Sequence, residues 1–328
     1  MQNKNIIFNE FKPSWWIKNR HLQTMWARLF KRPAHLNDSQ RYRLELEDTD
    51  FIDVDVFPLK DRPTLLLLHG LEGSIESPYI KGMIHAAKSR KWQVVVMHFR
   101  SCSGEENRLL KSYHNGVSDD LQLVLEKLQE INITVDYITG FSLGGNVLLK
   151  WLGENSKCSS IKAAAVVSVP MDVAICATEI HRGFSKLYEF VLLKTLKNKT
   201  RKKILKFGSR ILPNAKQLSK LTSFRLFDDQ VTAPVHGFKN AQDYYEKVSS
   251  KQFIKNIKIP TLIIHAKDDP FMNIKVLPHF NEIPKNITLE INDHGGHVGF
   301  VQVAWPWKVE YYLEKRIPDY FENLMGIV

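Results

Sequence analysis

Cysteine is scarce in this sequence. Only three cysteines occur among 328 residues: Cys102, Cys158 and Cys176. An odd number of cysteines without metal-ligand spacing excludes a disulfide framework and a structural zinc site. Because free thiols are typical of a reducing compartment, we expect a cytoplasmic protein, with association at a membrane surface left open.

Long apolar runs are also missing. The first residues, MQNKNIIFNEFK, contain no apolar segment followed by small residues, so we expect no cleaved signal peptide. The most apolar stretch, 162–177 (KAAAVVSVPMDVAICA), is interrupted by Ser168, Pro170 and Asp172 and is too short and too polar to span a bilayer. A hydrophobic content of 44% with 25% charged residues is normal for a globular protein with a sizeable core.

Acidic residues are nearly absent from one segment. Between Arg182 and Lys220, twelve lysines and arginines face one acidic residue, Glu189. This surplus equals the net charge of +11 of the whole chain, so the remainder is close to neutral. No base-stacking platform or groove-reading motif accompanies the charge, so we expect no nucleic-acid partner.

Strand-like and helix-like segments alternate along the chain. Residues 41–47 and 51–57 alternate apolar and polar side chains, which predicts an antiparallel pair at one edge of a sheet. Short apolar runs typical of strands buried on both faces lie at 64–70, 92–99, 135–140, 162–168, 260–266 and 287–292. Helical patterns lie at 79–90, at 116–131 with Ser118 as N-cap, from 143, at 274–281 and within 303–324. The pattern predicts an α/β fold with a mostly parallel sheet of about eight strands and helices on both faces.

The long interval between two of these strands is the main irregularity. Residues of about 171–250 contain helical runs and no linker rich in proline, glycine or serine. Insertions of this kind in α/β sheets commonly form a lid over the active site. We therefore expect a single domain over 1–328, with an N-terminal arm at about 1–40 and a helical cap at about 171–250.

The segment 136–151, DYITGFSLGGNVLLKW, contains the motif Gly-Phe-Ser-Leu-Gly with Ser142 at its centre. A nucleophile elbow holds a serine in a strained turn between strand and helix, and small residues two positions away on each side avoid a collision. Gly140 and Gly144 meet that need. A random chain of this length holds about 0.1 such pentapeptides when glycine and serine each make up roughly 7% of residues. The motif alone is therefore moderate support for a nucleophile.

A serine nucleophile requires a base and a carboxylate, and in this architecture they follow it in the order Asp or Glu, then His. Asp268 and Asp269 follow the strand at 260–266, and His294 and His297 follow the strand at 287–292. Both pairs lie at carboxyl ends of predicted strands, where doubly wound sheets place their sites. The turn before a proline favours Asp269, and two preceding glycines give His297 more reach.

The negative oxygen of an acyl-transfer intermediate requires two backbone N–H groups. Leu143, directly after Ser142, is one candidate donor. The other should lie in a loop after an early buried strand, and we assign it to Leu71, in the segment LLLLHGLEGS. His69 and Gly70 would shape that turn; a role for His69 as a metal ligand is the weaker alternative, because no partner stands at ligand spacing.

These motifs resemble the α/β-hydrolase superfamily, in particular the branch that contains the bacterial YheT-type hydrolases and the eukaryotic ABHD1/ABHD3-like lipases. The similarity extends nearly end to end and rests on NRHLQT (19–24), HGLEGS (69–74), HFRSCSGEENR (98–108), YHNGVSDDL (113–121), GFSLGGN (140–146), VTAPVHGFKNAQDYY (231–245), DDPF (268–271) and GGHVGF (295–300). The resemblance implies an esterase-type reaction with Ser142, Asp269 and His297 as the triad. Ser101 departs from the branch, which usually has glycine there.

Several polar residues have a structural and a functional interpretation. We favour scaffold contacts over binding of a substrate head group for Arg100, Glu105, Arg108, His114 and Asp120. Cys102 is expected to be a buried thiol and not a nucleophile. His236 is expected to pack in the cap, with contact to the substrate as the alternative.

The cap and the arm combine cations with apolar residues. A basic amphipathic helix pair can lie on an anionic membrane, but we favour a cap that covers the site with its apolar face while its cations stay in solvent. Similarly, Trp15, Trp16 and Trp26 in the arm are expected to pack against the body of the protein. Peripheral contact with an anionic membrane stays an alternative for both segments.

The sequence therefore predicts a serine hydrolase that cleaves small-molecule carboxylic esters with an apolar acyl or alcohol part, through an acyl-enzyme on Ser142. This chemistry requires no metal and no organic cofactor. An acyltransferase or thioesterase would use the same triad and is the first alternative. A non-catalytic protein that binds lipid surfaces through the basic cap is the second.

Overall fold

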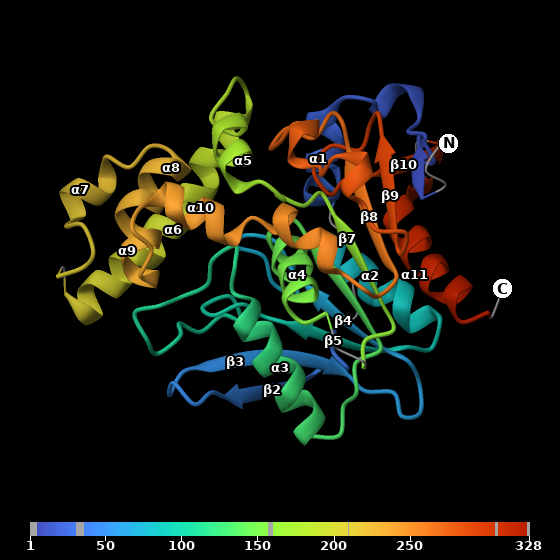
Figure 1. Ribbon diagram of the computed structural model, residues 1–328, viewed down its shortest axis with the longest axis horizontal. Helices are drawn as coiled ribbons and strands as arrows, with labels where there is room; N and C mark the ends of the chain where they lie inside the picture. The colour runs from blue at the N-terminus through green and yellow to red at the C-terminus, as the bar shows by residue number, and fades with distance from the viewer. Residues whose placement is uncertain (1–4, 31–35, 157–159, 209, 306–307, 327–328) are drawn as a thin grey trace.

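A nine-stranded sheet forms the centre of the protein (Figure 1). The computed structural model describes residues 5–30, 36–156, 160–208, 210–305 and 308–326. The strands are β1 (Ile6–Phe8), β2 (Gln40–Glu45), β3 (Phe51–Phe57), β4 (Thr64–Leu68), β5 (Gln93–Met97), β6 (Tyr137–Phe141), β7 (Ala163–Val167), β8 (Thr261–Ala266) and β9 (Ile287–Asn292). Their order across the sheet is β1-β9-β8-β7-β6-β4-β5-β3-β2.

The predicted fold class is confirmed. Strand β3 pairs antiparallel with both β2 and β5, so the predicted antiparallel pair lies at one edge, and the other neighbouring strands pair in parallel. All eight predicted strands are present. The ninth, β1, was missed because it spans three residues, too few for a periodic pattern, and its place is set by pairing with β9.

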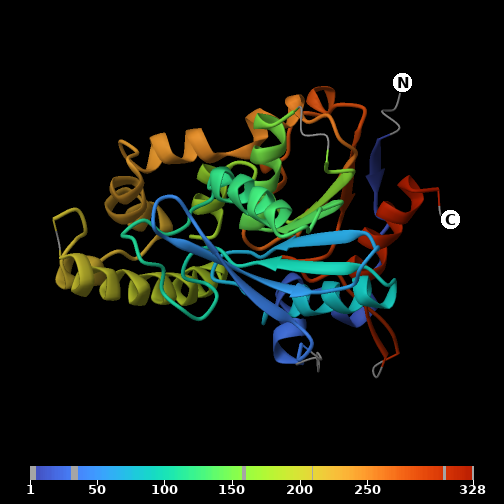
Figure 2. The ribbon, with the colours of Figure 1, turned by 90° about the horizontal axis from the view of Figure 1, so that it is seen from below.

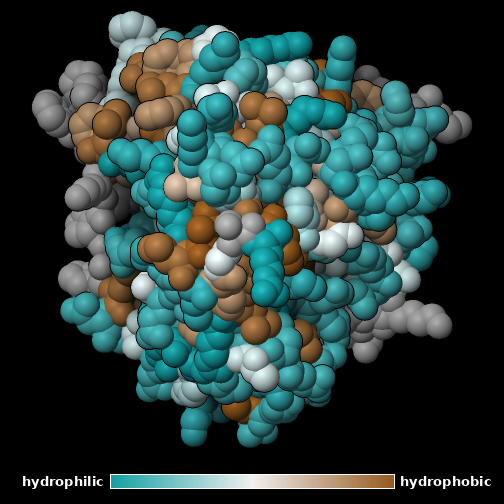
Figure 3. Space-filling view, turned by 90° about the vertical axis from the view of Figure 1, so that its left-hand side faces the viewer, coloured by the Kyte–Doolittle hydropathy of each residue, from teal (hydrophilic) through white to brown (hydrophobic). Residues whose placement is uncertain are grey.

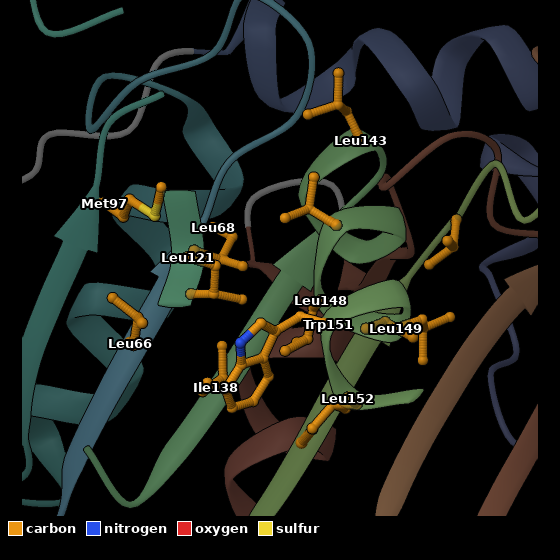
Figure 4. Close-up of a cluster of buried hydrophobic side chains, with 14 of the residues drawn as sticks. Leu66, Leu68, Met97, Leu121, Ile138, Leu143, Leu148, Leu149, Trp151 and Leu152 are labelled. Carbon is orange, nitrogen blue, oxygen red and sulfur yellow. The ribbon is translucent and has the colours of Figure 1, made fainter. Parts of the chain in front are cut away.

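Helices cover both faces of the sheet and create two apolar cores. Helices α3 (Ser118–Glu130) and α4 (Leu143–Glu154) lie on one face, and α2 (Pro78–Ser89) and α11 (Tyr312–Leu324) lie on the other (Figure 2). Because side chains of a strand alternate between faces, Leu66 and Leu68 of β4 pack toward α3 and α4 (Figure 4), whereas Leu65 and Leu67 pack toward α2 and α11. Each fully buried leucine contributes about 1.5–3 kcal/mol of hydrophobic free energy, so the alternation fixes the register of the sheet.

Two local predictions differ from the structure. Helix α3 begins at Ser118 itself, whose hydroxyl donates to Glu154 and does not cap the helix. The expected helix at 274–281 is instead two short 3-10 helices, η4 (Ile274–Val276) and η5 (Phe280–Glu282), since Pro278 disfavours helical backbone before it. The C-terminal helix, α11, lies within the predicted range 303–324 and starts at Tyr312, after a hairpin of β10 (Val301–Trp305) and β11 (Lys308–Tyr311) that was not predicted.

The segment between β7 and β8, called the cap from here on, is helical. It comprises α5 (Val173–Glu179), α6 (Ser185–Phe207), α7 (Ala215–Ser219), α8 (Phe224–Phe227), the π-helix η2 (Asp228–Thr232), α9 (Ala233–His236), α10 (Ala241–Val248) and the 3-10 helix η3 (Ser250–Asn256). Figure 1 shows most of these elements at one end of the sheet. The cap has an apolar cluster of its own, formed by Leu193, Leu212, Leu218, Leu221, Phe227 and Val231. That the chain is a single domain, and that the cap acts as a lid over the active site, both stay predictions.

The N-terminal arm contains η1 (Trp15–Ile17) and α1 (Arg20–Leu29). The rings of Trp16 and Trp26 lie 5.3 Å apart and pack beside the buried Ile17. The expectation that all three tryptophans pack is wrong for Trp15, which is 83% exposed. Trp15 and Trp16 are adjacent, and the sequence pattern did not show which of the two rings packs.

Candidate active site

Ser142 lies in a strained turn between β6 and α4. Its backbone angles, φ 51° and ψ −119°, are outside the regions that side-chain-bearing residues normally adopt. A Cβ atom at Gly140 would lie 2.6 Å from the carbonyl oxygen of Gly144, and one at Gly144 would lie 2.6 Å from the carbonyl oxygens of Leu68 and His69. Gly140 is therefore needed for the turn itself to be this tight, as the motif predicted, and Gly144 is needed for its close approach to the end of β4.

The structure brings Ser142, His297 and Asp269 together in one hydrogen-bonded chain. His297 Nε2 lies 3.0 Å from Ser142 Oγ, and His297 Nδ1 lies 2.9 Å from Asp269 Oδ2. An ionised carboxylate only accepts hydrogen bonds, so Nδ1 carries the proton and the Nε2 lone pair faces the serine hydroxyl. The Asp269 side chain is fully buried, and its other oxygen accepts from the Phe271 N–H at 2.8 Å. The arrangement can remove the proton from Ser142.

The neighbouring pair, Asp268 and His294, takes a different place. Asp268 Oδ1 accepts from the Gly296 N–H at 2.9 Å, and so braces the loop that leads to His297. The His294 ring lies 3.4 Å from Asp268 and is 38% exposed. Of the two alternatives in each pair, the structure places Asp269 and His297 at Ser142.

Two side chains that the sequence did not single out support His297. The Phe271 ring stacks on the imidazole, with centroids 4.0 Å apart. Ser168, in a left-handed conformation with φ 51° just after β7, accepts from the Val298 N–H at 3.1 Å. Ser168 lies at the carboxyl end of a strand, and this position was a usable signal in the sequence. Nothing in the sequence indicated the ring contact of Phe271.

The two leucines expected to supply N–H groups face the same cavity as Ser142. Leu143 is the first residue of α4, so its N–H has no acceptor within the helix and belongs to the positive end of the helix dipole. Leu71 lies in the turn after β4. The Gly70 N–H in that turn donates to the Tyr79 hydroxyl at 3.0 Å, which fixes the backbone next to Leu71.

His69 is a structural residue of this turn. Its Nδ1 lies 2.7 Å from the Gly70 carbonyl oxygen, and its Nε2 accepts from the Phe99 N–H at 3.2 Å. Burial lowers the pKa of His69 to about 3, so the ring is neutral. Both nitrogens are engaged, which leaves neither for a metal. Among the residues that the structure describes, no group of acidic, histidine or cysteine side chains could hold a metal ion.

A cavity of about 170 Å³ extends from Ser142 into the cap. Most of its lining is apolar and includes Leu110, Val173, Ile180, Leu192, Leu196, Leu212, Phe227 and Val231. Figure 3 shows the cap end of the molecule, where hydrophobic side chains gather within a mostly hydrophilic face. A cavity of this chemistry suits an apolar ligand.

The cavity also has polar lining residues, among them two histidines. The rings of His114 and His236 lie 4.5 Å apart, and His114 Nδ1 accepts from the Gly116 N–H at 3.0 Å. Burial lowers the pKa of both rings, that of His236 to about 4. The expectation of scaffold packing for these histidines is therefore incomplete, because both neutral rings also face the cavity.

Two cap lysines point inward. Lys199 Nζ lies 2.8 Å from Glu72 Oε1, which also accepts from the Tyr113 hydroxyl at 2.7 Å. Lys203 Nζ donates to Asn107 Oδ1 at 2.7 Å, and burial lowers the pKa of Lys203 to about 8. The expectation that the cap cations stay in solvent is therefore wrong for Lys199 and Lys203. Helix α6 has apolar residues on several sides, so its sequence pattern did not show which side faces inward.

The remaining polar candidates belong to the scaffold, as expected. Arg100 pairs with the buried Asp120 at 2.7 Å and with Asp50 at 3.0 Å. Arg108 pairs with Glu45 at 2.5 Å. The ion pair of Glu105 is with Arg43, at 3.0 Å.

The two cysteines that the structure describes, Cys102 and Cys176, are not nucleophile candidates. Burial raises the pKa of Cys102 to about 11 and that of Cys176 in the same direction, so both thiols are protonated at neutral pH. Cys158 lies outside the described residues.

Residues 63–302 match the family described as alpha/beta hydrolase fold. The chain belongs to the α/β-hydrolase family. It is 40% identical over 323 residues to the protein named "Putative esterase YheT" of Escherichia coli K12, covering 96% of this chain and 94% of that protein. It is 30% identical to the phospholipase ABHD3 of Mus musculus over 76% of this chain, and spans 61% of that longer protein.

Solved structures support the same fold. The Pyrococcus furiosus esterase Pf2001 superposes with a TM-score of 0.56 at 15% identity, covering 88% of this chain and 94% of that chain. The α/β-hydrolase fold is thus shown by sequence and by structure, and relatives of this chain carry esterase and lipase names. No helix within the described parts of the chain combines the length and apolar character needed to cross a bilayer.

Proposed function

We propose that this α/β-hydrolase cleaves carboxylic esters through an acyl-enzyme on Ser142. The observation that carries the proposal is the chain of hydrogen bonds from Ser142 through His297 to the buried Asp269, at the end of an apolar cavity. Each member has the position that its role requires: a hydroxyl on a sharp turn at the cavity, an imidazole within hydrogen-bond distance of it, and a buried carboxylate behind the imidazole.

The reaction takes two steps. Ser142 Oγ attacks the ester carbonyl carbon while His297 Nε2 takes its proton, and the N–H groups of Leu71 and Leu143 stabilise the oxyanion. The intermediate collapses, the C–O bond to the alcohol breaks, and His297 returns the proton to the leaving alcohol. Water then attacks the acyl-enzyme by the same route and releases the acid. Asp269 orients the imidazole and stabilises its protonated form.

The substrate class follows from the cavity and from the relatives. Aliphatic and aromatic side chains from the cap form most of the lining, so the cavity favours an apolar acyl or alcohol part. The names of the relatives, an esterase and a phospholipase, point to the same bond type.

The test compares the wild type with Ser142→Ala on a series of p-nitrophenyl esters of increasing acyl length, together with labelling by a fluorophosphonate probe. We expect Ser142→Ala to lose about 10⁵-fold in kcat and all labelling. Cys102→Ala is the matched control, and it should keep both. Full esterase activity in Ser142→Ala would exclude the proposal. Product analysis with and without added alcohol separates hydrolysis from acyl transfer.

We further infer that the outward side of α6 contacts an anionic membrane. Leu187, Phe190 and Leu205 are 52%, 65% and 88% exposed, and helical spacing places them on one side of α6 with Lys194 and Arg201. Exposed apolar side chains can enter the headgroup region, and neighbouring cations attract anionic lipid, so this side of α6 offers both contributions to binding at a membrane surface.

Co-sedimentation with phosphatidylglycerol vesicles tests this contact. Binding should exceed that to phosphatidylcholine vesicles and should fall at least tenfold in Phe190→Glu. The control is Leu324→Glu, on α11 at the opposite end of the molecule (Figure 1), which should bind as the wild type does. Equal binding by both variants would refute the contact.

A further inference from the structure

The arm motif NRHLQT (19–24) has no role in the proposed reaction, yet α1 lies directly against the loop that carries His297. Thr24 Oγ1 accepts a hydrogen bond from the His297 backbone N–H at 2.9 Å. The same hydroxyl donates to the Arg20 carbonyl oxygen at 2.7 Å. The Thr24 hydroxyl is thereby held in one orientation, with its lone pair toward His297.

Gln23 fixes the chain at Val301, four residues after His297. Its side chain is fully buried. Oε1 accepts from the Val301 N–H at 2.7 Å, and Nε2 donates to the carbonyl oxygens of Val301 and Ile17, both at 2.9 Å. The amide therefore binds both polar groups of one backbone residue, as a neighbouring strand would.

The loop is built to admit the arm backbone. A Cβ atom at Gly296 would lie 2.6 Å from the Arg20 carbonyl oxygen, and one at Gly299 would lie 2.2 Å from that of Gln23. Between and after these glycines, Val298 and Phe300 have φ values of 58° and 45°. Residues with side chains hold such conformations only when their surroundings fix them, and α1 supplies part of those surroundings.

We propose that Gln23 and Thr24 are positioning residues that hold the His297 loop so that Nε2 stays within reach of Ser142 Oγ. The proposal rests on the proposed function of Ser142 and His297. Neither arm residue touches the reacting atoms in this account; both act on the backbone that carries the base. A displacement of about 1 Å at a reacting group can cost about 100-fold in rate, so small shifts of the loop are sufficient for a measurable effect.

Thr24→Val is the decisive variant, because it preserves the side-chain volume and removes the acceptor. We expect kcat for a p-nitrophenyl ester and the rate of fluorophosphonate labelling to fall by about 10-fold to 100-fold, with KM within about twofold of the wild type. Thr24→Ser restores the hydroxyl and should recover most of both rates. A purely structural role of Thr24 would change the melting temperature without this pattern.

Thr178→Val is the matched control. Thr178 makes the same type of bond within its helix, from Oγ1 to the Ala174 carbonyl oxygen at 2.9 Å, but lies on α5 and is exposed. It should keep the wild-type kcat. Gln23→Glu is the second variant, which keeps the size and the Oε1 acceptor while losing the donor to the carbonyl oxygens of Val301 and Ile17, and we expect a fall in kcat of about 3-fold to 10-fold.

The outcomes separate this inference from the proposed function. If a folded Thr24→Val or Gln23→Glu protein retains the kcat and labelling rate of the wild type while Ser142→Ala is inactive, the positioning role is wrong and the serine mechanism stands. If Ser142→Ala is active, the proposed function itself is wrong. Loss of activity in Thr24→Val without recovery in Thr24→Ser would also contradict the positioning role.

Discussion

At the scale of single residues, the adjacent carboxylates of Asp268 and Asp269 have two different tasks. Asp269 is fully buried and hydrogen-bonded to His297, whereas Asp268 accepts from the Gly296 backbone. The two side chains are chemically identical and differ in direction and in burial. Their substitutions should therefore differ in effect by orders of magnitude.

We predict that Asp269→Asn lowers kcat for ester hydrolysis by about 10³-fold to 10⁴-fold, because an amide does not hold the imidazole in the required tautomer. Asp268→Asn is the matched control and should cost less than tenfold, since it affects the bond to Gly296 and the contact with His294 but no bond to His297. Steady-state kinetics on both variants decide the point. Comparable losses in the two would show that the carboxylates share the task, and our assignment would be wrong.

The sequence was informative where the constraint was local. The spacing of Gly140 and Gly144 around Ser142, and the order of strand-end residues after it, indicated all three members of the hydrogen-bonded chain. Thr24 and His297 are 273 residues apart, and their contact exists only because α1 packs on the loop. No periodicity or spacing encodes such a contact, so the supporting residues became visible only in the structure.

At the scale of elements, the cap and the loop of the Leu71 N–H are joined by an ion pair. Glu72 follows Leu71, has a left-handed backbone with φ 55°, and receives Lys199 from α6. The Glu72 N–H donates to the Tyr113 hydroxyl at 2.8 Å, which fixes the loop from a second side. The position of α6 is therefore linked to the backbone that would hold the oxyanion.

Exchanging the charges of this pair tests the link. We predict that Glu72→Lys and Lys199→Glu each lower kcat about tenfold or more, and that the double variant recovers part of the loss, with a coupling energy of about 1–2 kcal/mol. Lys202→Glu, on the exposed side of the same helix, should behave as the wild type does. Strict additivity of the two single losses would show that Glu72 and Lys199 act independently.

Elements were predicted best where a run of apolar residues was long enough to show its period. The buried strands β4 to β9 met that condition. Short elements such as β1 and the two 3-10 helices after β8 did not, because their conformation depends on pairing partners and on Pro278. The inward direction of Lys199 likewise depends on where Glu72 lies, which is a property of the assembled fold.

At the scale of the whole molecule, buried neutral histidines make stability depend on pH. Burial lowers the pKa of His265 to about 4 and that of His236 to about 4, below the ordinary 6.5. Neither ring nitrogen of His265 has a hydrogen-bond partner among the described residues. Below pH 6.5 the unfolded chain therefore binds protons that the folded protein excludes, and the free energy of unfolding falls as the pH falls from 6.5 toward 4.

His265→Leu should remove its share of this dependence. For a shift from 6.5 to about 4, the loss in the free energy of unfolding between pH 7 and pH 5 amounts to about 2 kcal/mol. The variant should lose about 2 kcal/mol less than the wild type over that interval, as measured by urea unfolding. His85→Leu alters an exposed ring and should leave the interval unchanged. The same loss in His265→Leu and in the wild type would contradict the prediction.

The central claim is that an acyl group is carried by Ser142, and mass spectrometry after rapid acid quench tests it most directly. The wild type, mixed with excess p-nitrophenyl ester and quenched within the first turnover, should gain the mass of one acyl group minus one hydrogen, located on the peptide that contains Ser142. His297→Ala should accumulate no such adduct on this timescale, because its serine is not activated. An acyl group found on another residue, or rapid turnover without any adduct at Ser142 at the earliest times, would contradict the account.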